Sequence, residues 1–285
     1  MNCRKFTTPL LLLLPLLACA PAMAAYTCTV SVTSVSPVYS PTAPSDNIST
    51  GLWIMNCTRA GGDASNLSYS ISADNGVQPA GGFNRVRNGA TANFYDYAAY
   101  RSAPYVAGNR WQATGPFVGT LSFGGSLTGS AFGTFDVVVP AGQAVKPAGT
   151  YTDIVTVTTR NTGTAATLDT SNFNVSVLTS NTCQITTPPG NINFTYTSFQ
   201  NTAATSGTTF ASRCTTGLPY TMALDATSGN LLGLTYTLSL PVAAATGTGV
   251  DQTFNIDGSI AASQSGVCTT ATCVDTQSRT LTISY

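Results

Sequence analysis

The residues of this sequence that could do chemistry are cysteines and aspartates, because the chain contains no histidine and all of its acidic residues are aspartate. Beyond residue 24 the sequence contains six cysteines, namely Cys28, Cys57, Cys183, Cys214, Cys268 and Cys273. An even number of cysteines in an exported chain favours disulfides over metal or redox chemistry. They do not form two close pairs, as a thiolate zinc site would, so no metal and no cofactor is predicted.

The N-terminus predicts export. A positive charge at Arg4 precedes a short apolar run at residues 9–17 and a small-x-small pattern at residues 22–24, the order found in secretory signal peptides. The apolar run is shorter than the ~20 residues needed to span a bilayer, so residues 1–24 are predicted to be a cleaved signal. The alternative is a lipoprotein with a lipid on Cys19, because the sequence that ends at Cys19 weakly resembles a lipoprotein cleavage box.

Composition narrows the functional classes. Only 8% of the residues are charged and the formal net charge is zero, which argues against nucleic acid as a partner, because nucleic-acid binding relies on clustered lysine and arginine. Hydrophobic residues make up 43% of the chain, enough to build cores, and disorder would need low hydrophobicity with high net charge. A length of 285 residues is compatible with two domains.

Strand signals recur along the chain, whereas helix signals are nearly absent. Apolar and polar residues alternate in residues 27–32, 67–71, 134–139 and 153–158, as a strand with one buried face requires. Clusters of Gly, Pro, Asn and Asp separate these runs, which is typical of a β-sandwich. The sequence therefore predicts an all-β protein built of sandwiches.

The sequence also contains an internal repeat. Each half opens with a Thr-Cys pair and has a second cysteine further on. The strand at residues 67–74 then matches residues 218–225, the segment 134–136 matches 253–255, and a closing strand follows in each half. Because these features recur in the same order, we infer a duplicated domain.

The repeat predicts domain boundaries and disulfides. The first domain is expected over residues 25–180 and the second over residues 181–285. One disulfide is expected in each, Cys28–Cys57 and Cys183–Cys214, each contributing roughly 3–4 kcal/mol in the chain-entropy model. The remaining pair, Cys268–Cys273, is expected to close a small loop.

The two copies differ after the closing strand. The first continues into residues 172–178, whose alternation predicts one more strand with Phe173, Val175 and Val177 facing the core. The second has no counterpart before Tyr285. A sandwich short of its last strand has an open edge that another strand can occupy, so the first domain is expected to complete itself and the second to need a partner strand. The alternative is that the second sandwich closes with one strand fewer.

The repeated segments resemble the spore coat protein U domain family, which includes the pilins of archaic, Csu-type chaperone–usher pili. The resemblance is carried by the early cysteine pairs, by Pro-Ala-Gly-Gln at residues 140–143 and by residues 148–155. It covers nearly the whole chain after the signal. The second copy departs from the pattern at residues 268–276, so the turn there must be built differently.

This resemblance implies an incomplete immunoglobulin-like pilin that a periplasmic chaperone holds and an outer-membrane usher polymerises by donor-strand exchange. Two-domain subunits of this kind resemble tip adhesins, and the predicted mature start leaves almost nothing ahead of Cys28 to donate. The resemblance therefore implies a pilus-tip adhesin that is exported through the periplasm to the cell surface. It would accept the next pilin's donor strand and support surface attachment and biofilm formation.

A tip adhesin of this kind would contact an abiotic or host surface through loops of its first domain. Aromatic and apolar residues are the expected contacts because they bring a large contact area, although residues 94–100 are expected to form a core strand. The candidate surface-binding residues are Val77, Phe83, Tyr105, Trp111, Phe117, Leu127 and Phe132.

Two other functions remain open. A structural spore-coat or extracellular-matrix protein could be built from the same domain. A secreted hydrolase would have to use aspartates such as Asp251 and Asp257, but both lie among turn residues and are expected to be solvated loop acids. No catalytic residue is therefore predicted.

Overall fold

The computed structural model describes residues 26–39, 45–89 and 91–285. The predicted signal, residues 1–24, and the alternative lipidation site Cys19 lie outside the described residues. Within them the chain consists of strands and loops with one turn of 3-10 helix, η1 (Ala107–Asn109). The predicted all-β fold is confirmed, and the described ranges contain no helix long and apolar enough to cross a bilayer.

The first nine strands form an N-terminal unit. They are β1 (Thr27–Val32), β2 (Asn47–Thr58), β3 (Asn66–Ala73), β4 (Asn84–Arg87), β5 (Phe94–Tyr100), β6 (Phe117–Ser122), β7 (Thr128–Val139), β8 (Gly149–Asn161) and β9 (Thr167–Thr179). One layer has the order β1-β2-β7-β5 and the other the order β4-β8-β3-β6. β5 joins the two layers, because its first half pairs with β4 and its second half with β7. β9 pairs with β8.

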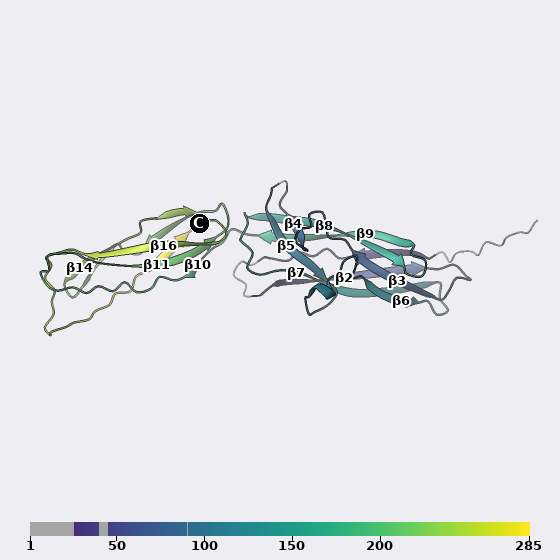
Figure 1. Ribbon diagram of the computed structural model, residues 1–285, viewed down its shortest axis with the longest axis horizontal. Helices are drawn as coiled ribbons and strands as arrows, with labels where there is room; N and C mark the ends of the chain where they lie inside the picture. The colour runs from purple at the N-terminus through teal and green to yellow at the C-terminus, as the bar shows by residue number, and fades with distance from the viewer. Residues whose placement is uncertain (1–25, 40–44, 90) are drawn as a thin grey trace, which may run out of the picture.

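The remaining strands form a C-terminal unit. They are β10 (Cys183–Thr187), β11 (Ala204–Cys214), β12 (Pro219–Leu224), β13 (Ser228–Leu231), β14 (Leu234–Ser239), β15 (Ala244–Thr246), β16 (Asp251–Ile260) and β17 (Leu281–Ser284). One sheet has the order β10-β11-β16-β14-β13 and the other β15-β12-β17. No described strand of this unit pairs with a strand of the first, and the two units lie end to end in an elongated molecule (Figure 1).

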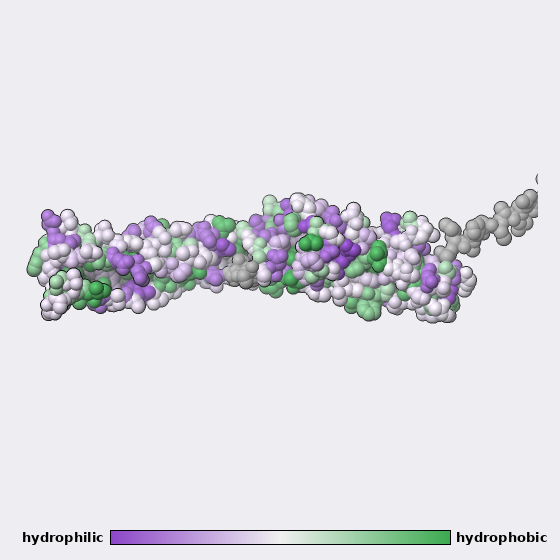
Figure 2. All heavy atoms as spheres, turned by 60° about the horizontal axis from the view of Figure 1, so that its bottom comes forward, coloured by the Kyte–Doolittle hydropathy of each residue, from purple (hydrophilic) through white to green (hydrophobic). Residues whose placement is uncertain are grey.

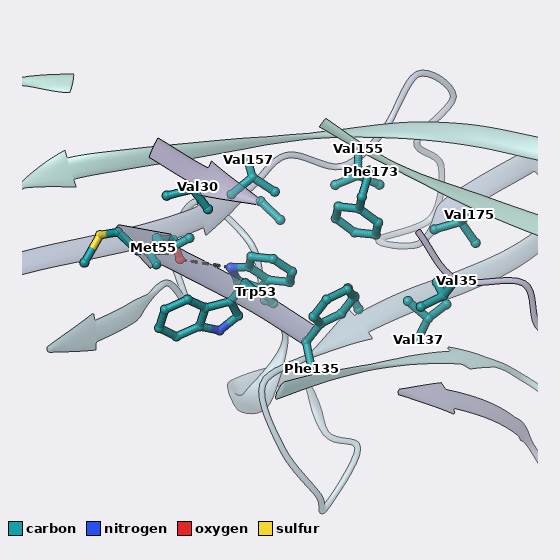
Figure 3. Packing of buried hydrophobic residues seen from close by; sticks show 14 of the residues in the cluster. Val30, Val35, Trp53, Met55, Phe135, Val137, Val155, Val157, Phe173 and Val175 are labelled. Carbon is teal, nitrogen blue, oxygen red and sulfur yellow. Dashed lines mark hydrogen bonds between the residues drawn. The ribbon is translucent and has the colours of Figure 1, made fainter. Parts of the chain in front are cut away.

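The core of the N-terminal unit lies between its two layers. Trp53 of β2 and Phe135 of β7 are buried opposite Val155 of β8 and Phe173 of β9 (Figure 3). The Phe173 ring lies 5.1 Å from that of Phe135 and is stacked on Trp111 at 5.8 Å, measured between ring centroids. The residues that face this core stand at alternate positions of each strand, as Trp53 and Met55 do in β2, which is the period expected of a strand with one buried face.

Three disulfides form among the described residues, and their pairing is the predicted one. Cys28–Cys57 and Cys183–Cys214 each join residues directly opposite one another on the first two strands of a unit. Cys268–Cys273 closes a loop ahead of β17. The two units therefore begin with the same stapled hairpin of strands.

Both units also build one turn in the same way. The side chain of Gln143 accepts a hydrogen bond from the Asp96 amide (2.8 Å) and donates to the Asp96 carbonyl (3.0 Å). The side chain of Gln264 makes the same two bonds with Thr235, at 2.7 and 2.9 Å. The residue before each glutamine has a positive φ, 76° and 63°. This correspondence supports the duplication inferred from the sequence.

The structure corrects one detail of the repeat. The sequence match pairs Phe135 with Phe254. In the sheets, however, Phe135 lies opposite Gly51, and Ile256 lies opposite Thr208. Gly51 precedes Cys57 by the same number of residues as Thr208 precedes Cys214. Ile256 therefore takes the place of Phe135. The repeated phenylalanine suggests a register that is wrong by two residues, which preserves the inward direction of the side chain.

A short linker and a backbone contact join the units. Residues 180–182 connect β9 to β10, and the amide of Thr215 donates to the last linker residue (2.9 Å). Val145, in the loop after β7, is buried. Its amide donates to the Gly249 carbonyl (2.9 Å), and its carbonyl accepts from the Thr216 amide (3.2 Å). The contact resembles a short piece of β-ladder between the units.

Candidate functional site: the open edge of the C-terminal unit

β17 is an edge strand. Among the described residues it pairs with β12 on one side and with no strand on the other. Its core-facing residues Leu281 and Ile283 are only partly buried. We call the unpaired side of residues 275–285 the open edge.

In the N-terminal unit β9 covers the equivalent edge. β9 pairs antiparallel with β8 along nearly its whole length. Its inward side chains Phe173, Val175 and Val177 are at most 1% exposed. The residues that the sequence assigns to a closing strand therefore lie in the core beside β8.

The other side of β9 is also bonded, to residues 33–39. The Val35 amide donates to the Asn174 carbonyl (3.0 Å), and the Ser176 amide donates to the Val35 carbonyl (3.0 Å). β9 thus lies between β8 and this segment, with backbone hydrogen bonds on both sides.

Residues 191–196 correspond to residues 33–39 in the C-terminal unit. The Tyr39 hydroxyl donates to a carbonyl of the glutamine turn of its own unit (2.6 Å), and the Tyr196 hydroxyl does the same in the second unit (2.9 Å). Ile192 and Phe194 pack over Gly258, where a Cβ would collide with them. Residues 191–196 make no backbone–backbone hydrogen bond within the described chain, so their backbone groups are unpaired.

Two hydrogen bonds fix which residues of β8 and β17 correspond. The Asp74 amide donates to the Thr156 carbonyl (2.9 Å), and the Asp74 carboxylate accepts from the Thr156 amide (3.0 Å). Asp225 and Thr280 make the same two bonds at 2.9 and 3.0 Å. Thr280 is therefore the structural counterpart of Thr156.

From this anchor the inward positions can be compared one by one. Val155 and Val157 are 0% and 1% exposed under β9. Their counterparts are Arg279 and Leu281, and both are partly exposed. The row of side chains that β9 covers in one unit is therefore uncovered in the other, and it carries an arginine.

Arg279 is held by neutral oxygens. Its Nε donates to the Tyr236 hydroxyl (2.8 Å) and its Nη2 to the Ser228 carbonyl (2.8 Å). The Tyr236 hydroxyl donates in turn to the Gln277 side chain (2.6 Å). Gly229 provides the space, because a Cβ there would collide with the guanidinium and with Gln277.

The N-terminal unit has a buried acid in the corresponding place. The Tyr97 hydroxyl donates to Asp153 (2.7 Å), as Tyr236 does to Gln277. Burial raises the pKa of Asp153, although the bond from the Val77 amide opposes this. Burial also raises the pKa of Tyr97. The second unit replaces this buried acid with a neutral amide beside an arginine.

The open edge can bind an extended chain. Together with residues 191–196 it offers unpaired backbone groups and partly buried apolar side chains. These are the features used in binding by strand addition, where backbone bonds give affinity and side-chain sites give specificity.

The predicted surface-binding residues are spread over the N-terminal unit. Val77, Leu127 and Phe132 are 61%, 52% and 78% exposed, whereas Phe83, Tyr105 and Phe117 are partly buried. On the face seen in Figure 2, hydrophobic residues are interspersed with hydrophilic ones. The exposed members are therefore separate side chains on different loops and strands.

The predicted role of Trp111 in surface binding is wrong. It is 2% exposed, and its indole nitrogen donates to the Ile71 carbonyl (2.9 Å). The loop after β5 turns back on the sheet, with the Trp111 amide bonded to the Ala99 carbonyl (2.9 Å). Trp111 is consequently a core residue.

The two aspartates considered for hydrolysis lie in β16, not in loops as predicted. Asp251 forms an ion pair with Arg213 (2.9 Å), which lowers the pKa of Asp251, and Asp257 is exposed. Six residues along a strand separate them by ~20 Å, beyond the ~5–9.5 Å between paired glycosidase carboxylates. Among the described residues no three His, Cys, Asp or Glu side chains gather as a metal site.

One protein family accounts for most of the sequence. The Spore Coat Protein U domain matches residues 15–158 and 169–239. The chain belongs to the Spore Coat Protein U domain family. The matched segments include the glutamine turn of the N-terminal unit and the first strands of the C-terminal unit. No curated protein matches the sequence.

Several solved structures are similar to this member of the family at low identity. The CsuC–CsuE chaperone–tip subunit complex of Acinetobacter baumannii is 13% identical, covering 90% of this chain and 99% of that one, with a TM-score of 0.45. The CupB6 tip adhesin of Pseudomonas aeruginosa is 10% identical, with coverages of 86% and 90% and a TM-score of 0.40. The CssB subunit of enterotoxigenic Escherichia coli, complemented with a CssA donor strand, is 16% identical, with coverages of 53% and 97% and a TM-score of 0.31.

Proposed function

We propose that this protein is a chaperone–usher pilus subunit whose C-terminal unit is completed by a strand from the next subunit. The open edge is the observation that carries the proposal. β17 and residues 191–196 correspond to the two neighbours of β9, and no described strand pairs with either of them on that side. The N-terminal unit supports the proposal by holding such a strand in the same place.

The energetics favour a bound strand. A fully buried aliphatic side chain contributes roughly 1.5–3 kcal/mol, and a strand would complete the burial of Leu281, Ile283, Ile192 and Phe194. It would also bond to the free backbone groups on both sides. An edge left open would instead be a site of aggregation.

The family resemblance supplies the assembly pathway. A periplasmic chaperone occupies the open edge during export. At the outer-membrane usher the donor strand of the next pilin then replaces the chaperone. The protein thereby reaches the cell surface as part of a fibre.

We place the N-terminal unit at the free end of that fibre, as a tip adhesin. β9 closes this unit from within the chain, so it needs no donor. Its exposed side chains Val77, Leu127 and Phe132 are available to attach to an abiotic or host surface, and such attachment promotes biofilm formation.

The proposal can be tested by supplying the strand within the chain. In the correspondence given above, Tyr285 takes the place of Asn161, the last residue of β8. Adding a second copy of residues 162–179 directly after Tyr285 therefore repeats the β8–β9 hairpin. Calorimetry should show the C-terminal unit melting at least ~5 °C higher, since ~1 kcal/mol shifts a unit of this size by that amount.

A matched control carries asparagine in place of the two inward valines of the added copy, those equivalent to Val175 and Val177. It has the same length but cannot fill the core. If both fusions melt like the unmodified protein, the C-terminal unit is already closed. The chain would then be a self-contained coat or matrix module.

A further inference from the structure

The open edge has a charged residue where β9 covers an apolar one. Val155 of β8 is fully buried and pairs with Phe173 of β9. Its counterpart Arg279 has a side chain that is 20% exposed. A strand bound as β9 is bound would therefore place one inward residue directly opposite Arg279.

The arginine is built into this place rather than pointing away from it. Its guanidinium lies over the Tyr236 ring, 5.6 Å from the centroid, and donates to the Tyr236 hydroxyl and the Ser228 carbonyl. The absence of a side chain at Gly229 makes room for it. These contacts fix the position of the guanidinium beside the open edge.

The charge of Arg279 is only partly compensated. The nearest carboxylate, on Asp225, is 3.8 Å from Nη1 and is itself 42% exposed. The hydroxyl and the carbonyl that accept its other bonds are neutral. The other cation of this unit, Arg213, is paired with Asp251 at 2.9 Å. Arg279 is thus the cation with unused donor capacity near the open edge.

Covering Arg279 changes its energetics. A strand placed over it removes the remaining water, and burying an incompletely paired charge is unfavourable. Inward residues directly opposite on antiparallel strands have Cβ atoms ~4.5–5.5 Å apart, a distance that a carboxylate can bridge to a guanidinium. A phenylalanine at that position, as in β9, offers no acceptor.

We propose that Arg279 selects the strand that completes the C-terminal unit, by requiring an acidic side chain at the position that pairs with it. This inference rests on the proposed function and adds the chemistry of the partner. The occupant is an extended segment of another chain with apolar residues at its flanking inward positions and Asp or Glu opposite Arg279. The chain's own β9 sequence, with Phe173 at that position, is a weaker ligand for this edge than one with an acid there, although covalent fusion after Tyr285 still holds it in place.

Synthetic peptides test the proposal on the full-length, disulfide-bonded protein. One peptide copies Thr167–Thr179, and two others carry Glu or Gln in place of Phe173. The Glu peptide should bind about tenfold or more tightly than the Gln and Phe peptides, because a charge-assisted hydrogen bond is worth ~1.5–3 kcal/mol. Titration calorimetry measures each dissociation constant.

The variant Arg279→Val reproduces the N-terminal unit at this position. It should reverse the order, so that the Phe peptide becomes the tightest ligand. Circular dichroism and the melting curve establish whether the variant folds. A second measurement uses the unmodified protein, in which the advantage of Glu over Gln should shrink at high salt and when the glutamate is protonated.

The outcomes separate the two proposals. If no peptide binds either protein and the hairpin fusion does not raise the melting temperature, the proposed function fails. If peptides bind but Glu, Gln and Phe are equivalent on the unmodified protein, the edge accepts strands and the role of Arg279 is wrong.

Discussion

Replacing Phe173 with alanine measures how far the N-terminal unit depends on its own closing strand. Phe173 is 1% exposed, and its ring contacts Phe135 at 5.1 Å and Trp111 at 5.8 Å. These two rings come from different segments, β7 and the loop after β5, so they cannot easily collapse into the space that the substitution leaves.

The expected loss follows from this packing. Removing a buried phenylalanine side chain costs about 3–5 kcal/mol, because the transfer free energy is lost and a cavity remains. For a unit of this size each kcal/mol lowers the melting temperature by roughly 2–4 °C. The N-terminal transition should therefore fall by roughly 10 °C, while the C-terminal transition stays in place.

Differential scanning calorimetry of the full-length protein provides the assay, since each unit should give its own transition. Ile154→Ala is the matched control. Ile154 lies on β8 beside β9 but is 49% exposed, so its substitution should change the free energy of unfolding by no more than ~0.5 kcal/mol. A similar small effect for Phe173→Ala, or a shift of the C-terminal transition instead, would refute the role assigned to β9.

Further predictions concern the buried acid and the disulfides. Because burial raises the pKa of Asp153, the folded state keeps this proton to a higher pH than the unfolded state, whose pKa is about 3.9. The free energy of unfolding should therefore fall as the pH rises from the unfolded pKa through the raised folded pKa, and Asp153→Asn should abolish that part of the pH profile measured by urea denaturation. A profile unchanged by the substitution would show that Asp153 is ionised in the folded state without penalty. Replacing both Cys28 and Cys57 with alanine should cost roughly 3–4 kcal/mol by loss of the cross-link, measured by the same denaturation, whereas the double substitution of Cys268 and Cys273 should cost less because the loop it closes is short.

Alternation of side chains predicts the centres of the strands but not their ends. Residues 153–158 and 172–178 are predicted from their period of two, and they lie within β8 and β9. The observed strands extend further in both directions, mostly through polar residues. These flanking residues pair because a neighbouring strand is present, which a local pattern cannot show.

The burial of Trp111 and the inward position of Arg279 depend on contacts with residues distant in sequence. Trp111 lies in a loop, where an aromatic side chain is expected to be exposed, but the return of that loop to β5 buries it. Arg279 stands in an alternating run at an inward position, whereas its charge favours an outward one. Gly229, on another strand, provides the space in which the Arg279 side chain can point inward.

The linker at residues 180–182 has a mechanical consequence. Since it connects β9 directly to β10, a pull on the C-terminal unit along the long axis (Figure 1) acts lengthwise on β9. Antiparallel backbone bonds run perpendicular to the strand, so this load strains the whole β8–β9 ladder in shear instead of peeling it bond by bond. Val145 gives the force a second route between the units. The N-terminal unit is thus tethered to the C-terminal unit by a continuous covalent chain, and tension cannot release it by dissociation.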